Sequence, residues 1–211
     1  METSEETKFT IEGMFPIPLY ITHKCSDLDV LELEDVKSII EDGMHVNKFN
    51  TRSNNTYIFD TKLKKIKEFC EQHIKIYVEQ VISPHENLDF YITQSWLNVT
   101  KQGESHQKHS HSNSIISGVF YISTIENDTV CFHDISIVAK ERMHILSATQ
   151  HMFNSGERIL SVKALDLVMF PSWLEHHVNL NETTVDRISL SFNVFAKGIF
   201  GHINNLNRLD I

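Results

Sequence analysis

Five of the thirteen histidines lie in two short segments and have spacings that suit metal binding. The first segment contains His106, His109 and His111, and the second contains His176 and His177. In an extended chain, side chains two residues apart point to the same face, so the imidazoles of His109 and His111 can converge. Adjacent strand residues face opposite ways, so at most one of His176 and His177 can join them. The spacing predicts a metal site of two or three imidazoles.

The ligand types limit which metal such a site would take. Three imidazoles, or two imidazoles and a carboxylate with open positions, suit non-haem Fe(II), and Zn or Mn also accept these ligands. A zinc finger is excluded, because Cys25, Cys70 and Cys131 do not accompany the histidines at finger spacing. An odd number of cysteines without a C-x-x-C motif also argues against a disulfide framework, so we expect reduced and mostly buried thiols.

A possible anion-binding pair opens a later segment. Arg187 lies 11 residues after His176, and in a strand it shares a face with Ser189. A guanidinium can hold a carboxylate through two hydrogen bonds, and the serine hydroxyl can add another. An isolated arginine at the start of a strand is more often solvated, but an upstream metal site favours the anion-binding interpretation.

The first third of the chain has helical periodicity. Apolar residues in the segment 28–42 recur close to every 3.6 residues, and Gly43 offers a left-handed cap. Asp60 offers an N-cap for a second helix, which Ser83-Pro84 ends. One buried stripe is expected along this second helix, formed by Leu63, Ile66, Cys70, Ile74, Tyr77 and Val81.

From residue 88 the chain changes to short segments rich in β-branched and aromatic residues, separated by turn residues. The expected strands are 90–99, 115–123, 129–132, 159–162, 165–170 and 187–195. This pattern favours an antiparallel barrel or jelly roll, and the lack of α/β alternation excludes a doubly wound sheet. We expect one mainly β, α+β domain over 1–211, with a helical support region at 1–87 packed on one face of a β core at 88–198.

Composition and charge limit the function further. The chain has 211 residues, 41% hydrophobic and 22% charged, which is enough for one core and excludes a disordered chain. The net charge of −9 gives no overall footprint for nucleic acid. No apolar run approaches the roughly 20 residues of a membrane span, and the acidic segment 1–12 does not resemble a secretory signal. We therefore expect a cytoplasmic protein without nucleic-acid or membrane partners, and a homodimer stays open.

Four segments together resemble the 2-oxoglutarate/Fe(II)-dependent oxygenases, in a group found in bacteria and phages and related to prolyl hydroxylases. The segments are Trp96–Val99, His109–Ile122, Phe170–His176 and Arg187–Asn193. The resemblance implies a double-stranded β-helix (jelly roll), ferrous iron, O2, and 2-oxoglutarate as co-substrate. It also implies hydroxylation of a prolyl-like protein side chain or a small metabolite, coupled to decarboxylation of 2-oxoglutarate to succinate, in a bacterial or phage-infected cell.

Within this resemblance, His109 and His176 correspond to iron ligands. The position two residues after the first histidine usually bears Asp or Glu in the superfamily, and here it is His111. Two options follow: a site of three histidines, or a carboxylate supplied from elsewhere, for which Asp134 is the nearest candidate.

The resemblance also assigns residues to 2-oxoglutarate. Arg187, with Ser189, corresponds to the group that holds its far carboxylate. Asn98 and Tyr121 lie on expected strands that can face the barrel interior and hydrogen-bond the co-substrate, although ordinary core roles suit them equally well.

Two other functions fit part of the sequence. A cupin-type metal-dependent dioxygenase or isomerase is suggested by Gly103, which gives G-x5-H-x-H with His109, and by the P-x-x-x-x-H spacing of Pro171 and His176. Against it, the glutamate expected after H-x-H is missing, and Trp173 stands where that motif has glycine. The third alternative is a non-catalytic ligand-binding jelly roll with incidental histidines.

Overall fold

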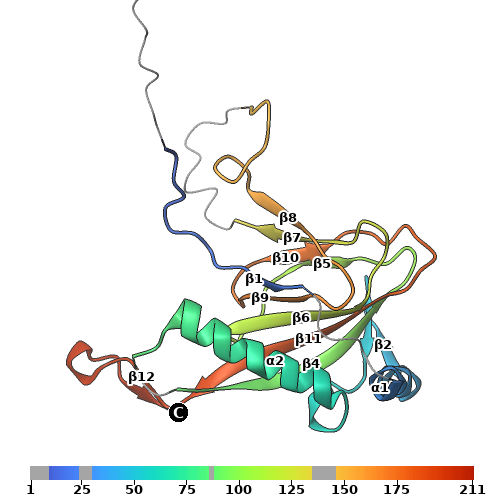
Figure 1. Cartoon of the computed structure of the whole chain (residues 1–211), viewed down its shortest axis with the longest axis horizontal. Coiled ribbons are helices and arrows are strands. Elements are labelled where there is room, and N and C mark those ends of the chain that lie inside the picture. The colour runs from blue at the N-terminus through green and yellow to red at the C-terminus, as the bar shows by residue number, and fades with distance from the viewer. Residues whose placement is uncertain (1–9, 24–29, 86–87, 135–145) are drawn as a thin grey trace, which may run out of the picture.

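The computed structural model places two antiparallel β-sheets against each other, with a long helix across the outer face of the larger sheet (Figure 1). The structure describes residues 10–23, 30–85, 88–134 and 146–211. Cys25 and the start of the expected helix 28–42 lie outside these ranges. The layered antiparallel architecture agrees with the expected mainly β, double-stranded β-helix fold.

The larger sheet has seven strands in the order β1-β9-β6-β11-β4-β3-β2, and the smaller has four in the order β5-β10-β7-β8. Neighbouring strands are mostly distant in sequence, as a jelly roll requires. The larger sheet consists of β1 (Tyr20–Thr22), β2 (Met44–Val46), β3 (Thr51–Ser53), β4 (Asp89–Thr100), β6 (Ile116–Ser123), β9 (Leu167–Pro171) and β11 (Arg187–Lys197). The smaller sheet consists of β5 (His106–His109), β7 (Thr129–His133), β8 (Glu157–Ser161) and β10 (His176–Val178). A C-terminal hairpin is formed by β12 (Ile199–Phe200) and β13 (Leu209–Asp210).

The helices are α1 (Val30–Glu41) and α2 (Lys64–Tyr77), and α2 continues into a π-helical turn at Val78–Ile82. Short 3-10 turns lie at Ile58–Asp60 and Ile203–Asn205. None of these helices, over the residues that the structure describes, has the length and apolarity needed to cross a membrane.

The prediction that Asp60 caps the second helix is wrong. Asp60 belongs to the preceding 3-10 turn, and α2 begins after Leu63, whose φ is +57°. Two amides at the start of α2 instead donate to acidic side chains of α1: that of the N-cap residue Leu63 to Asp35 Oδ2 at 2.7 Å, and that of Lys65 to Glu32 Oε1 at 2.9 Å. These carboxylates satisfy amides without helical partners and favour the positive end of the helix dipole, so capping here also docks α1 onto α2.

All six expected strands form, and they correspond to β4, β6, β7, β8, β9 and β11. Five strands of three or four residues were not expected: β1, β2, β3, β5 and β10. Three or four residues are too few to show a clear period-two alternation in the sequence. Such segments become strands because they pair with neighbouring strands in the folded chain. Two of them, β5 and β10, carry the clustered histidines.

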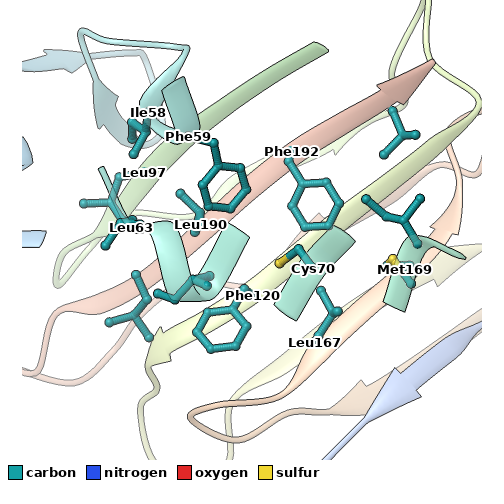
Figure 2. Packing of buried hydrophobic residues seen from close by; sticks show 14 of the residues in the cluster. Ile58, Phe59, Leu63, Cys70, Leu97, Phe120, Leu167, Met169, Leu190 and Phe192 are labelled. Atoms are coloured by element: carbon teal, nitrogen blue, oxygen red, sulfur yellow. The ribbon is translucent and has the colours of Figure 1, made fainter. Parts of the chain in front are cut away.

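The main core fills the space between α2 and the outer face of the larger sheet. Cys70 on α2 lies close to Phe120 of β6 and Phe192 of β11, and all three side chains are fully buried (Figure 2). The expected stripe on α2 is buried except for Val81, which is 40% exposed. Val81 lies in the π-helical turn, whose wider winding rotates it away from the stripe.

A second core lies between the two sheets and includes Tyr121, Phe132 and Phe170. Strand β9 serves both cores, because its alternate residues face opposite sides of the sheet: Leu167 packs into the first core and Val168 into the second. This burial on two faces explains the continuous apolar run in the sequence.

Strand β11 separates apolar from polar residues by the same alternation. Its even-numbered residues from 188 to 194 pack toward α2, while Arg187, Ser189, Ser191 and Asn193 form a buried polar row on the other face. Polar side chains on an inner face must find partners or a ligand. This row leads directly to the candidate site.

Strand β6 has no room for a side chain at Gly118. A Cβ at this position of β6 would overlap the ring of Phe192 on the paired strand β11. Gly118→Ala should therefore lower the free energy of unfolding by on the order of 1–3 kcal/mol, measured by chemical denaturation. Gly13→Ala is the control, because its Cβ would meet Met152 at an ordinary 3.7 Å. Equal stability of the two variants would contradict this account.

Candidate metal centre

Three histidines converge where the smaller sheet meets the end of the larger one. His109 ends β5, His111 lies in the following turn, and His176 begins β10, paired directly with His109. Their ring centroids are separated by 4.3 Å (His109 to His176), 5.1 Å (His109 to His111) and 5.3 Å (His111 to His176). One ring nitrogen from each lies within 4.8 Å of the others. We call these three residues the histidine trio.

Each imidazole of the trio has its Nδ1 directed at an oxygen that only accepts hydrogen bonds. Nδ1 must therefore carry the proton, and Nε2 keeps a free lone pair. The contacts are His109 Nδ1 to Gln107 O at 2.8 Å, His111 Nδ1 to Asn193 Oδ1 at 2.6 Å, and His176 Nδ1 to Leu174 O at 3.1 Å. Outer hydrogen bonds of this kind are typical of metal-ligating histidines.

The Nε2 atom of His111 is buried and has no hydrogen-bond partner among the described residues. A buried polar atom without a partner is costly unless a ligand satisfies it. A metal cation fits here, because the three lone pairs are neutral donors that lie close to one another. The donor set holds no carboxylate and therefore leaves the full charge of a divalent ion uncompensated.

Burial keeps the trio neutral. It lowers the pKa of His176 to about 3, with a further contribution from nearby His109, and it also lowers the pKa of His109 and of His111. The pKa of His106 is likewise lowered to about 3, by burial first and then by His109, His111 and Arg187. Neutral imidazoles near pH 7 are the form that binds metals.

The alternative carboxylate, Asp134, does not join the trio. It follows β7, and its backbone amide donates to Gly156 O at 2.8 Å. His177 also stays apart, since it lies on the opposite face of β10 from His176 and has its Nδ1 2.7 Å from His133 Nε2.

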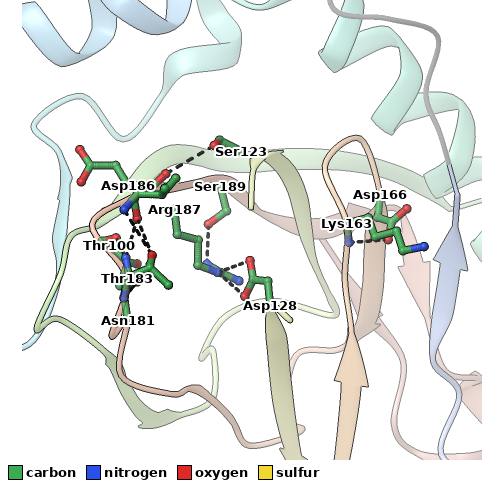
Figure 3. Close-up of polar contacts among 11 residues, drawn as sticks. Thr100, Ser123, Asp128, Lys163, Asp166, Asn181, Thr183, Asp186, Arg187 and Ser189 are labelled. Atoms are coloured by element: carbon green, nitrogen blue, oxygen red, sulfur yellow. Dashed lines mark hydrogen bonds and ion pairs between the residues drawn. The ribbon is translucent and has the colours of Figure 1, made fainter. Parts of the chain in front are cut away.

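Arg187 lies deep between the sheets and is only 3% exposed. Its Nε donates to both oxygens of Asp128 at 2.9 and 2.8 Å, and its Nη1 lies 3.4 Å from Ser189 Oγ (Figure 3). The guanidinium also stacks over the ring of Tyr121 at 5.0 Å. Asp128 therefore engages the Nε side of the guanidinium, and Ser189 lies beside Nη1.

The other two expected contacts of 2-oxoglutarate lie in the same interior. Asn98 donates from Nδ2 to Ser191 Oγ at 3.0 Å, and its Oδ1 is buried without a hydrogen-bond partner among the described residues. Tyr121 is fully buried, and burial raises its pKa to about 12, so it remains a neutral phenol.

Two residues of this region were not assigned from the sequence. One is Asp128, since nothing local in the sequence marks it as the partner of an arginine 59 residues away. His106 belongs to the same histidine segment and stacks on His109 with ring centroids 4.3 Å apart. Its position three residues before His109 was the only feature of the sequence that could have placed it at the site.

An open pocket of about 370 Å³ lies beside the trio. Its walls are mainly polar, with one large aromatic side chain, Trp96, whose ring centroid is 5.9 Å from that of His111. The lining includes Asn47, Asn50, Arg52, Gln94 and His106. A small molecule with several hydrogen-bonding groups suits such a pocket.

Comparison with known proteins gives one family. Residues 94–193 match the family described as "Putative 2OG-Fe(II) oxygenase", a segment that contains all of the trio and Arg187. No curated protein matches the sequence. The match favours the oxygenase interpretation over the cupin-type and non-catalytic alternatives.

Solved structures share the fold at low sequence identity. An oxidoreductase of the 2OG-Fe(II) oxygenase family from Burkholderia pseudomallei is 8% identical, with 83% of each chain covered and a TM-score of 0.57. A Pseudomonas putida prolyl-4-hydroxylase is 12% identical, with 84% of this chain and 92% of that chain covered and a TM-score of 0.55. HygX from Streptomyces hygroscopicus, with nickel, 2-oxoglutarate and hygromycin B bound, is 11% identical, with coverages of 84% and 82% and a TM-score of 0.55.

The buried imidazoles predict acid sensitivity of the metal-free protein. The pKa of His176 is about 3 in the folded chain and 6.5 ordinarily, so the unfolded chain binds more protons between these values. The free energy of unfolding should therefore fall as the pH drops below 6.5, with a slope approaching about 1.4 kcal/mol per pH unit from this residue. Chemical denaturation of the protein and of His176→Gln at pH 7.5, 6 and 5 tests this. An unchanged slope in the variant would contradict it.

Proposed function

We propose that this chain is a 2OG-Fe(II) oxygenase, the family that residues 94–193 match, that the histidine trio binds its ferrous iron, and that it hydroxylates a small polar substrate. Iron and 2-oxoglutarate are the cofactor and co-substrate of this family. The polar pocket beside the trio supports a metabolite or an exposed peptide side chain, such as a prolyl group, as the substrate.

The observation that carries the proposal is the convergence of three imidazoles, with one ring nitrogen of each within 4.8 Å of the others. Each outer Nδ1 donates to an oxygen, and the Nε2 of His111 is buried without a partner among the described residues. Three neutral ligands leave open positions on iron, as an oxygenase requires. Iron supplies the activation of O2 that is coupled to decarboxylation of 2-oxoglutarate, while the protein positions the reactants and excludes water.

The chain's own residues orient the metal ligands and the co-substrate. Asn193 Oδ1 fixes the ring of His111 and also accepts a hydrogen bond from Ser117 Oγ at 3.2 Å, so the third ligand is tied to β6 and β11. Arg187, with Ser189, is proposed to hold the far carboxylate of 2-oxoglutarate. Asp128 holds the guanidinium from its Nε side and so directs the other nitrogens.

The proposal is tested by iron content and by succinate release from 2-oxoglutarate. His109→Ala and His176→Ala should lose stoichiometric iron and turnover, because each removes a nitrogen of the trio. His45→Ala is the matched control, since His45 is an exposed histidine of β2. Full iron occupancy in both trio variants would exclude these residues as ligands.

Three further variants decide between the three-histidine site and a carboxylate ligand. His111→Asp should retain iron, because it creates the two-histidine, one-carboxylate set that suits non-haem Fe(II). Asp134→Ala should be tolerated, because Asp134 lies outside the trio. Iron loss in Asp134→Ala together with iron retention in His111→Ala would instead assign Asp134 as the ligand.

Arg187 should determine affinity for 2-oxoglutarate. Losing one partner of a buried charge pair costs on the order of 2–5 kcal/mol, so Arg187→Ala should weaken binding by about 30-fold or more. Arg187→Lys should rescue partly, because it keeps the charge beside Asp128 but lacks the planar fork. Anaerobic titration of the Fe(II)-loaded protein measures this, with iron content as the control for folding. Unaltered affinity in Arg187→Ala would remove the residue from the site.

A further inference from the structure

A second cluster of potential metal ligands lies behind the trio, on the other face of the smaller sheet. Cys131 and His133 are two residues apart on β7 and share a face, and His177 of β10 pairs directly with Cys131. One ligand atom of each lies within 4.8 Å of the others. Because His176 faces the core between the sheets, its neighbour His177 must face outward.

The hydrogen bonds of the two imidazoles leave a place for a cation. His133 Nδ1 lies 3.4 Å from Glu157 Oε1, and His177 Nε2 lies 3.0 Å from Asn179 Oδ1. The Asn179 oxygen only accepts, so the outer nitrogen of His177 carries the proton and its Nδ1 keeps the lone pair. The inner nitrogens, His133 Nε2 and His177 Nδ1, lie 2.7 Å apart, so in the metal-free chain His133 Nε2–H donates to His177 Nδ1. A metal ion can replace this shared proton, because His133 can carry its proton on Nδ1, beside Glu157, and then both inner nitrogens present lone pairs.

The sulfur of Cys131 completes a set of one thiolate and two imidazoles. This side chain is only 2% exposed, and its hydrogen-bonding contact among the described residues is a long one, 4.0 Å to Phe132 O. Sulfur and imidazole nitrogen are the ligands that zinc prefers, whereas the all-nitrogen trio suits iron. The two clusters therefore differ in the metal that they favour.

We propose that Cys131, His133 and His177 bind a Zn²⁺ ion, with solvent in the fourth position. On binding, the thiol of Cys131 releases its proton to water and a zinc–sulfur bond forms. Tetrahedral zinc with bonds of about 2.05 Å separates two nitrogen ligands by about 3.3 Å, so the two rings need to part by less than 1 Å. An open pocket lined by His133, Glu157 and His177 gives access to the two imidazoles, and the buried Cys131 is not part of its lining.

Glu157 and Asn179 act as the outer partners of this site. A carboxylate or amide oxygen that accepts from the far nitrogen of a ligating histidine fixes the ring and its tautomer. Glu157 lies on β8, opposite His133 in the sheet register, so the ion would link β7, β8 and β10. The proposal does not depend on the iron site, because none of its ligands belongs to the trio.

A zinc ion at this site would stabilise the position of β10. This strand has only three residues, and it carries His176 on one face and His177 on the other. A zinc ion on the outer face holds β10 against β7 and so fixes the position of His176 without touching it.

The test uses Co²⁺ as a spectroscopic probe and Zn²⁺ as the metal, with the full-length protein. Co²⁺ bound at this site should give a thiolate-to-cobalt charge-transfer band, which Cys131→Ser should abolish and Cys70→Ala should retain. Zn²⁺ titration against a chromophoric chelator should show one equivalent lost in Cys131→Ser, His133→Gln and His177→Gln. Zn²⁺ should also raise the melting temperature of the parent protein more than that of these variants.

The outcomes separate the two metal sites. A cobalt band that persists in Cys131→Ser, or one that never forms in the parent protein, would overturn the zinc site. His109→Ala and His176→Ala should lose the other equivalent and keep the cobalt band. If those trio variants lose no metal while Cys131→Ser does, the zinc site stands and the proposed iron site fails.

Discussion

The pairing of β10 with β5 on one side and β7 on the other is the interaction on which the proposed chemistry of this chain depends. It places His176 opposite His109 and, one residue later, His177 opposite Cys131. Since successive strand residues face opposite sides, one short strand delivers a histidine to each of two separate clusters. A shift of register by one residue would exchange the two faces and dismantle both.

Strand β11 extends this arrangement into the interior. Its apolar face holds α2 through Phe192 and its neighbours, while its polar face runs from Asn193, beside His111, to Arg187, beside Asp128. Core stability and ligand positioning therefore share one strand. The apolar face anchors the polar row, which keeps the proposed 2-oxoglutarate contacts in place before any ligand binds and reduces the entropy that binding must overcome.

The two clusters differ in donor type and burial, and these differences favour a different metal at each of the two proposed sites. The trio offers three neutral nitrogens, including the unsatisfied His111 Nε2, and opens on a polar pocket. The outer cluster adds the sulfur of Cys131, which softens the donor set and favours zinc. The departure at position 111 from the usual carboxylate leaves the proposed iron site more positive, and a more positive site attracts a dicarboxylate co-substrate more strongly.

Local spacing by itself determined much of this protein. The i, i+2 relation of His109 and His111, the alternation at His176, and the periodicity of six strands and α2 are properties of short segments, so the sequence alone predicts them. Tertiary structure decided what depends on pairing between distant segments. Asp128 meets Arg187, and acidic residues of α1 cap α2, only because the fold brings remote turns and helices together. The outer cluster follows the same rule: no spacing in the chain relates Cys131 to His177, and only the register between β7 and β10 makes them neighbours.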